Sequence, residues 1–129
     1  MFDSELSILA IYGLIVAISV ALQTSGLLGQ FGVSYLLSAR DEARSATGTT
    51  ARLDRAQSNA VQAMALFAPA ILILAAKGAF SDASLIAAQV FLVARVIYLP
   101  AYALGITGLR TLVWLVGFLS SISLYFLAL

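Results

Sequence analysis

Four long apolar stretches, separated by short polar segments, make up most of this 129-residue chain. A helix needs about 20 mostly apolar residues to cross the hydrocarbon core of a bilayer, and each of the four stretches is long enough. Hydrophobic residues make up 62% of the chain and charged residues 10%, whereas a typical soluble domain has roughly 25% charged residues. A surface with so little charge is suited to lipid rather than water. We therefore expect an all-α fold, an integral membrane four-helix bundle.

The polar segments indicate where the helices begin and end. An arginine-containing loop separates the first two apolar stretches, and two glycine-containing turns separate the others. We expect helices over about residues 6–37, 51–77, 83–104 and 109–129. Thr50 and Ser81 are the expected N-caps of the second and third helices, and Pro69 should kink the second. At this length, residues 1–129 are expected to form a single domain.

The basic residues are distributed unevenly between the loops. Arg40, Arg44, Arg52 and Arg55 surround the first loop, whereas Lys77 is the only basic residue near the second. Basic residues concentrate in cytoplasmic loops of membrane proteins. We therefore expect the first and third loops to be cytoplasmic, and in a bacterium the protein would lie in the inner membrane with both termini facing the periplasm.

The composition excludes several classes of chemistry. The chain has no cysteine and no histidine, so it has no cysteine nucleophile, and it lacks both the commonest general base and the commonest metal ligand. We expect no metal site. Seven Lys+Arg against six Asp+Glu give a net charge of +1, which provides no broad basic face for nucleic acid.

Arg95 is the most informative single residue, because it lies near the middle of the third apolar stretch. An arginine at the centre of a membrane helix costs about 2.5–3.5 kcal/mol on insertion scales and usually faces the protein interior. Tyr98 and Tyr102 follow it by three and seven residues, so the three side chains share one helical face. This donor-rich face suits an anionic ligand. The alternative is an arginine that locks helices together through a carboxylate or backbone carbonyls.

The second stretch carries a comparable polar stripe. Arg55, Asn59 and Gln62 follow the spacing i, i+4, i+7 and therefore lie on one face near the cytoplasmic end. A solvated extension of the helix would account for the more polar positions before Asn59. Asn59 and Gln62 are followed closely by an apolar run, and unsatisfied amides are costly in lipid. We expect these two to face partners or a polar cleft.

Arg110 and Thr111 are at the start of the fourth helix, with Trp114 one turn later. A helix N-terminus offers free backbone N–H groups and the positive end of the helix dipole. An arginine and a hydroxyl at this point suit an oxyanion or the thiolate of a substrate. The alternative is an interfacial arginine that reaches the lipid headgroups, with Trp114 in the aromatic belt.

Two of these segments resemble the MAPEG family, the membrane-associated proteins in eicosanoid and glutathione metabolism. The run Arg55-Ala-Gln-Ser-Asn-Ala-Val-Gln62, followed by Phe67-Ala-Pro69, is similar to the second-helix signature Arg-Ala-x-x-Asn-x-x-Glu of that family. The run Arg95-Val-Ile-Tyr-Leu-Pro-Ala-Tyr102 is similar to its third-helix pattern Arg-x-x-Tyr/His-x-x-x-Tyr. The resemblance extends over all four helices and the first loop.

This resemblance implies a homotrimer that holds glutathione between neighbouring subunits near the cytoplasmic face. By position, the expected glutathione ligands are Arg55, Asn59, Gln62, Arg95, Tyr98 and Tyr102. Arg110 would be the catalytic residue that stabilises the glutathione thiolate. The expected substrate-binding residues are Arg40, Thr111 and Trp114, of which Arg40 has the loosest match.

The resemblance implies a membrane-bound glutathione transferase or peroxidase that acts on apolar electrophiles dissolved in lipid. Two positions depart from the family pattern. Gln62 replaces a glutamate, which removes a charge that would pair with the ligand, and Trp114 replaces a tyrosine found in some members. Gln62 favours a first alternative, a non-catalytic membrane protein that binds a lipid or protein partner. A second alternative is a small subunit of a larger membrane complex.

Overall fold

The computed structural model describes residues 2–129, and its elements are all helices. The helices are α1 (Glu5–Phe31), α2 (Val33–Leu37), α3 (Gly48–Lys77), α4 (Asp82–Ala103) and α5 (Thr107–Ala128). All except α2 are long and apolar enough to cross a membrane. The expected bundle of four membrane-spanning helices is therefore confirmed.

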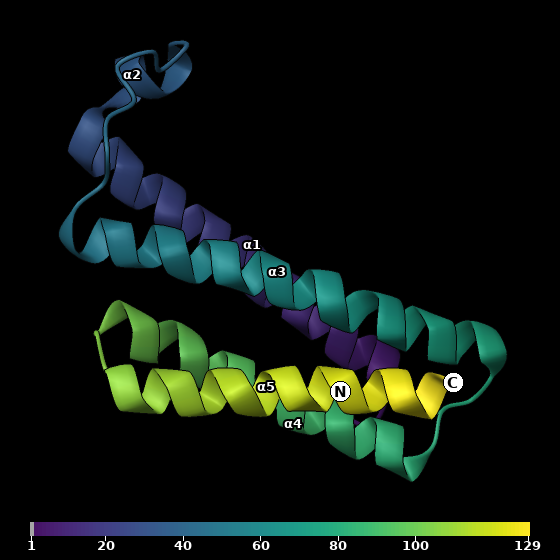
Figure 1. Cartoon of the computed structure of the whole chain (residues 1–129). Helices are drawn as coiled ribbons and strands as arrows, with labels where there is room; N and C mark the ends of the chain where they lie inside the picture. Colours follow the sequence, from purple (N-terminus) through teal and green to yellow (C-terminus); the bar gives the residue numbers. More distant parts are fainter. Residues whose placement is uncertain (1) are drawn as a thin grey trace.

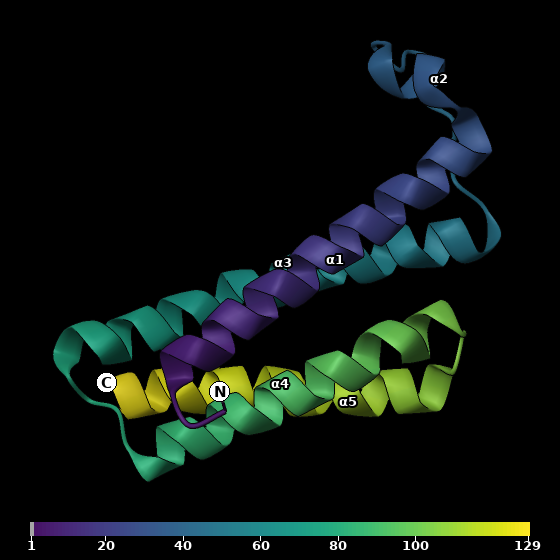
Figure 2. The same cartoon turned by 180° about the vertical axis from the view of Figure 1, so that it is seen from behind.

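The four long helices run roughly along one axis, as Figures 1 and 2 show. α4 and α5 form a hairpin, and α1 packs along α3. The loop that contains α2 and the α4–α5 turn lie at one end of the bundle, which we call the loop end. Both termini and the α3–α4 turn lie at the other end, which we call the terminal end.

The expected continuous helix over residues 6–37 is wrong at its C-terminal part. Gly32 has φ +81° and ψ +165°, outside the helical region, and it separates α1 from the five-residue helix α2. Glycine adopts a positive φ at little cost because it has no Cβ. The chain bends at this point, and α2 projects from the loop end of the bundle (Figure 1).

The helix starts agree with the expectation in one case and differ in two. Ser81 is the N-cap of α4, with reciprocal Ser81–Ser84 bonds that form a capping box. Thr50 is not the N-cap of α3, because the helix begins at Gly48 after Thr47, and Thr50 is buried inside its first turn. α5 begins at Thr107, two residues before the expected start. α3 continues through Pro69 without ending.

Three aromatic rings from three helices form the centre of the core. Tyr12 on α1 contacts Phe91 on α4 edge-on at a centroid distance of 4.9 Å, and Phe91 stacks on Phe67 of α3 at 3.9 Å. Each ring is at most 1% exposed. Arg95 follows Phe91 by one helical turn, so its side chain begins directly on the loop-end side of this aromatic core.

Candidate ligand-binding site

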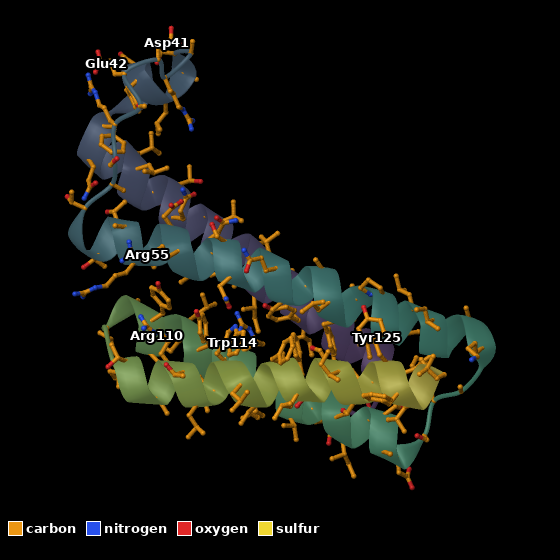
Figure 3. The ribbon with its side chains drawn as sticks, in the orientation of Figure 1. Asp41, Glu42, Arg55, Arg110, Trp114 and Tyr125 are labelled. Atoms are coloured by element: carbon orange, nitrogen blue, oxygen red, sulfur yellow. The ribbon has the colours of Figure 1, made fainter. Side chains whose placement is uncertain are left out.

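Six of the polar side chains singled out from the sequence lie together at the loop end of the bundle. They come from three helices: Arg55 and Asn59 from α3, Arg95, Tyr98 and Tyr102 from α4, and Arg110 from α5. We call these six residues the arginine cluster. Arg55 and Arg110 are at the same end of facing helices in Figure 3. Helices α3, α4 and α5 thus bring together residues up to 55 positions apart, as the contacts below show.

Arg95 is at the centre of the cluster and is 2% exposed. One terminal nitrogen, Nη2, donates a hydrogen bond of 2.8 Å to Oδ1 of Asn59. The guanidinium carbon lies 4.2 Å from the centroid of the Tyr98 ring, within range of a cation–π interaction. Arg95 is therefore held from both sides, by an amide on α3 and an aromatic ring on its own helix.

The Nε–H group of Arg95 has no hydrogen-bond partner in residues 2–129, although the atom is buried. A buried polar group without a partner costs about 1–3 kcal/mol, and more when it is charged. Few such groups occur in native structures, and they often mark a functional position. The unpaired donor indicates that the helix packing of this single chain does not fully satisfy Arg95.

A second set of contacts joins the three helices closer to the loop end. Nε of Arg55 donates a 3.1 Å hydrogen bond to the Tyr102 hydroxyl. The guanidinium carbon of Arg110 lies 4.7 Å from the centroid of the same ring. Tyr102 also contacts the Tyr98 ring at a centroid distance of 5.6 Å. The two tyrosines therefore connect the inner cation, Arg95, to the two outer ones.

The charges of the cluster are not balanced by the protein. Arg55, Arg95 and Arg110 each carry a positive charge at any ordinary pH, and none forms an ion pair with a carboxylate within residues 2–129. Asp54 is next to Arg55 in sequence, but its carboxylate accepts a 2.9 Å hydrogen bond from Gln23 on α1. Arg95 is buried, Arg110 is half-buried and Arg55 is exposed. A buried charge is usually paired, so the surroundings of Arg95 are suited to binding an anion.

Three other predicted site residues lie outside this set of contacts. Gln62 is exposed on α3 and has no hydrogen bond within the described chain. The Thr111 hydroxyl donates to the Thr107 carbonyl of its own helix at 3.1 Å. Trp114 stacks on Phe118 at a centroid distance of 5.4 Å and is 39% exposed. Within residues 2–129, none of these three side chains makes a hydrogen bond or ring contact with the arginine cluster.

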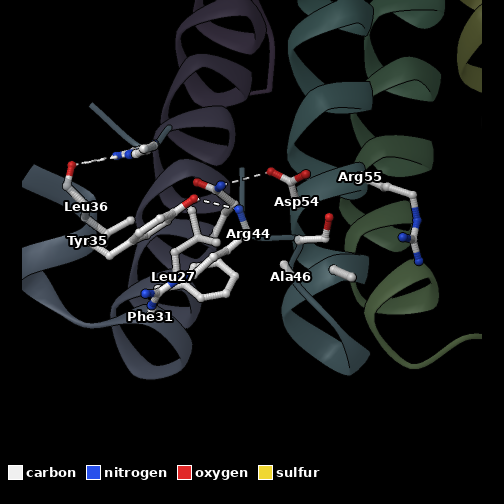
Figure 4. Close-up of a pocket in the computed structure, with 12 residues that line it drawn as sticks. Leu27, Phe31, Tyr35, Leu36, Arg44, Ala46, Asp54 and Arg55 are labelled. Carbon is white, nitrogen blue, oxygen red and sulfur yellow. Dashed lines mark hydrogen bonds between the residues drawn. The ribbon is translucent and has the colours of Figure 1, made fainter. Parts of the chain in front are cut away.

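Arg40 lies in a different place, on the wall of a cavity of about 430 Å³ between the α2 loop and the first turns of α3 (Figure 4). Its guanidinium donates two hydrogen bonds, of 3.3 and 3.1 Å, to the Leu36 carbonyl. Arg40 and Ala43 both have a positive φ, of 56° and 48°, which is uncommon for residues with a Cβ. Asp54 and Arg55 of α3 both line the cavity, and Figure 4 shows their side chains extending from α3 in different directions. Arg40 makes no direct contact with the arginine cluster, but Arg55 of the cluster also lines this cavity.

The other side of this cavity is held by an ion pair at the protein surface. Nε of Arg44 donates a 2.6 Å hydrogen bond to the Glu42 carboxylate, and its guanidinium carbon lies 4.6 Å from the Tyr35 ring centroid. The hydrogen bond from Arg44, and secondarily its charge, hold the pKa of the Glu42 carboxyl below its usual value. Both side chains of this pair are exposed, so the pair orders the loop more than it stabilises the fold.

Two residues near Arg95 were not identified from the sequence. Tyr12 lies beside Arg95 and donates a 2.9 Å hydrogen bond to the Ala60 carbonyl. Gly117 on α5 faces the Arg95 side chain. Gly117 follows Arg110 by seven residues, which places both on one face of α5. That spacing could have identified it, whereas nothing local to Tyr12 distinguishes it from an ordinary core tyrosine.

Comparison with known proteins gives one family. The model of the MAPEG family matches residues 6–129, which is nearly the whole chain. Neither the curated proteins nor the solved structures gave a match.

Proposed function

The chain belongs to the MAPEG family, the membrane proteins of eicosanoid and glutathione metabolism, and from this premise we propose that it binds glutathione at the arginine cluster. The observation that supports this most directly is the group of three guanidiniums, Arg55, Arg95 and Arg110, none of which has a carboxylate partner in residues 2–129. Such a site suits an anionic ligand with several acceptor groups.

The residues of the cluster fit glutathione in charge and hydrogen bonding. Glutathione has two carboxylates, one ammonium and one thiol, so its net charge is negative at neutral pH. Arginine binds carboxylates well because its planar fork of donors matches their geometry. The unpaired Nε–H of Arg95 and the amide of Asn59 are further donors or acceptors for such a ligand. The cluster contains no carboxylate for the ammonium group.

We propose that the activity is conjugation of glutathione to an electrophile, or reduction of a hydroperoxide. Glutathione supplies the thiol, whose pKa of about 8.5 leaves it mostly protonated at neutral pH. Positive charge nearby lowers the pKa of a thiol. Arg110 is the residue best suited to this role, since it is in the first turn of α5, where the helix dipole adds positive potential.

An apolar groove supports access of the electrophile from the lipid side. A groove of about 330 Å³ lies between α4 and α5, and apolar residues form most of its lining. Ala94 and Val113 line this groove and also pack against Tyr98 of the cluster. An apolar molecule dissolved in the bilayer would therefore approach the cluster along this groove.

The proposal is tested by titrating the purified protein in detergent with glutathione and measuring the heat of binding. Ophthalmic acid, in which a methyl group replaces the thiol, is the matched ligand. We expect both to bind, because the cluster recognises the carboxylates, and we expect only glutathione to support turnover of an aryl halide or an organic hydroperoxide. If neither ligand binds, the proposed function is wrong.

We also propose that three copies assemble and that the loop end is cytoplasmic. The trimer follows from the family, and the arginines at the loop end support the orientation. Native mass spectrometry that finds only monomer or dimer would exclude the trimer. A reporter fused after Leu129 should read as periplasmic in a bacterial inner membrane, and a cytoplasmic reading would reverse the orientation.

A second candidate function is supported by Gln62. The family signature has glutamate at this position, and here the neutral side chain is exposed without a hydrogen bond in the described chain. A carboxylate for the ammonium group of glutathione is therefore missing from the expected place. A non-catalytic membrane protein that binds a different anion, such as a lipid headgroup, fits this feature. Binding of an anionic lipid without any binding of glutathione would favour it.

A further inference from the structure

The side chain of Arg95 crosses α5 at a residue without a side chain. Gly117 is buried in the interior of α5, and its backbone is helical. A Cβ built on Gly117 would lie 3.3 Å from Cδ of Arg95, 3.7 Å from Cβ of Ala94 and 4.0 Å from Cδ2 of Phe91. The closest of these three atoms belongs to the stem of Arg95. The glycine therefore leaves a notch in α5 that the Arg95 stem occupies.

We propose that Gly117 is a positioning residue, which sets the direction in which Arg95 presents its guanidinium. This inference rests on the proposed function, because its consequence is for ligand binding. The guanidinium has two fixed neighbours, the Asn59 amide at 2.8 Å and the Tyr98 ring at 4.2 Å. A stem displaced from the notch cannot keep both contacts without a change of side-chain torsions.

A contact of 3.3 Å is tighter than most contacts that a Cβ makes, so the neighbour has to move by a few tenths of an ångström. Ala94 and Phe91 are buried in the α4–α5 interface and are held by close packing. The Arg95 stem has several rotatable bonds, so it is the part that can move. A methyl group at residue 117 would therefore be accommodated mainly by Arg95.

The effect on stability should have the opposite sign to the effect on binding. Glycine is a poor helix former compared with alanine, so Gly117→Ala should leave the melting temperature unchanged or raise it. A glycine kept only for close packing of helices would give the reverse, because the added methyl would separate α4 from α5. This difference distinguishes a positioning role from a packing role.

Gly108 provides the matched control. It is also on α5, and a Cβ built on it meets no atom within 4 Å. Gly108→Ala therefore makes the same chemical change on the same helix without touching Arg95. We expect it to leave both glutathione binding and the environment of Arg95 unchanged.

The test uses Gly117→Ala, Gly108→Ala and the parent protein, each purified in detergent. One measurement is the Kd of glutathione by calorimetry, and another is the thermal unfolding temperature. A third is the NMR signal of the Arg95 Nε–H group, assigned by its loss in Arg95→Lys. The NMR signal reports the position of Arg95 whether or not glutathione binds.

We expect Gly117→Ala to shift the Nε–H signal, to keep the unfolding temperature and to weaken glutathione binding about tenfold, as expected for a misaligned charged hydrogen bond. An unchanged signal with unchanged Kd would overturn the inference, and so would a fall in unfolding temperature that accounts for the loss of binding. If the parent does not bind glutathione but the signal still shifts in Gly117→Ala alone, the proposed function fails and the positioning role of Gly117 stands.

Discussion

The polar side chains at the two ends of the bundle differ in whether the chain itself provides their hydrogen-bond partners. At the terminal end, the Ser84 hydroxyl hydrogen-bonds to the buried carboxylate of Glu5 and accepts a 2.8 Å hydrogen bond from the Ser81 amide. Nζ of Lys77 donates to the Ala128 carbonyl at 2.5 Å. These groups are satisfied by partners from the same chain, and they connect α1, α3, α4 and α5.

At the loop end, the arginine cluster contains more hydrogen-bond donors than the chain has acceptors to pair with them. Three guanidiniums converge on two tyrosines and one asparagine, and no carboxylate pairs with any of the three within residues 2–129. Polar groups inside a membrane protein are costly in both places. At the terminal end they hold helices together, whereas at the loop end they remain available to a ligand.

Arg95→Leu should have the largest effect, and it should weaken glutathione binding without unfolding the protein. Truncating one partner of a buried charge pair costs about 2–5 kcal/mol, which corresponds to a Kd for glutathione raised by about 30-fold or more. Folding should be preserved, because removing a charge from a helix centre relieves an insertion cost of about 2.5–3.5 kcal/mol. Calorimetry and native mass spectrometry measure the two effects.

Arg52→Leu is the control for this change, since Arg52 is an exposed arginine at the same end, over the α4–α5 turn. The proposed difference between the two ends would be contradicted if Arg95→Leu dissociated the oligomer and the parent protein did not bind glutathione. Arg95 would then be a structural residue, like Ser84 at the opposite end.

Ser84→Ala, at the terminal end, should lower stability without changing glutathione binding. The change removes the acceptor of the Ser81 amide and the partner of the Glu5 carboxylate, so the free energy of unfolding should fall by about 2 kcal/mol. The Kd for glutathione should stay the same. Thermal unfolding in detergent measures the loss, and Ser123→Ala, at an exposed serine bonded only within α5, is the control. A loss of binding without a loss of stability would contradict the separation of the two ends.

Arg110→Ala should spare binding and change reactivity. Without the guanidinium, the pKa of the bound thiol should return toward its free value of about 8.5, and conjugation at neutral pH should slow about tenfold for a change of one pKa unit. The sign follows from the thiolate being the reactive form, so the rate should recover as the pH rises above the thiol pKa. A pH–rate profile measures this, and an equal loss of rate at all pH values would exclude a role of Arg110 in ionising the thiol.

Gln62→Glu should have the smallest effect on glutathione binding, and it should strengthen binding rather than weaken it. It restores the carboxylate of the family signature at an exposed position, where the proposed function would have it pair with the ligand's ammonium group. One additional exposed ion pair contributes up to about 1 kcal/mol, so the Kd for glutathione should fall by about two- to fivefold. Calorimetry at low salt gives the value, with Gln57→Glu one and a half turns earlier as the control. Weaker binding in Gln62→Glu would show that residue 62 does not face the ammonium group.

Much of the fold was readable from local features of the sequence. Apolar stretches of sufficient length predicted the four long helices, because backbone groups in lipid have to be satisfied within a helix. The Ser81 cap was also predictable, since a serine before a helix bonds to the N–H groups of its first turn. The break at Gly32 was missed because a glycine inside a long apolar run signals neither a helix nor its end.

Part of the arginine cluster was also readable. Helical spacing predicted that Arg95, Tyr98 and Tyr102 share a face, and that Arg55 and Asn59 share another. The same rule grouped Gln62 with Arg55, and position at the start of a helix grouped Thr111 with Arg110, but neither Gln62 nor Thr111 contacts the cluster in the described chain. Spacing along one helix shows which residues lie on the same side, but not which neighbouring helix that side meets.

The local chemistry of the chain, its length and its periodicity therefore account for the membrane helices and for the faces on which the arginines lie. Packing between helices accounts for the rest: that Arg95 meets Asn59, that Arg40 and Arg55 line one cavity, and that Gly117 accommodates the Arg95 stem. Helical periodicity is a property of a few consecutive residues. The notch at Gly117 exists only because α4 and α5 pack closely enough for one missing methyl group to matter.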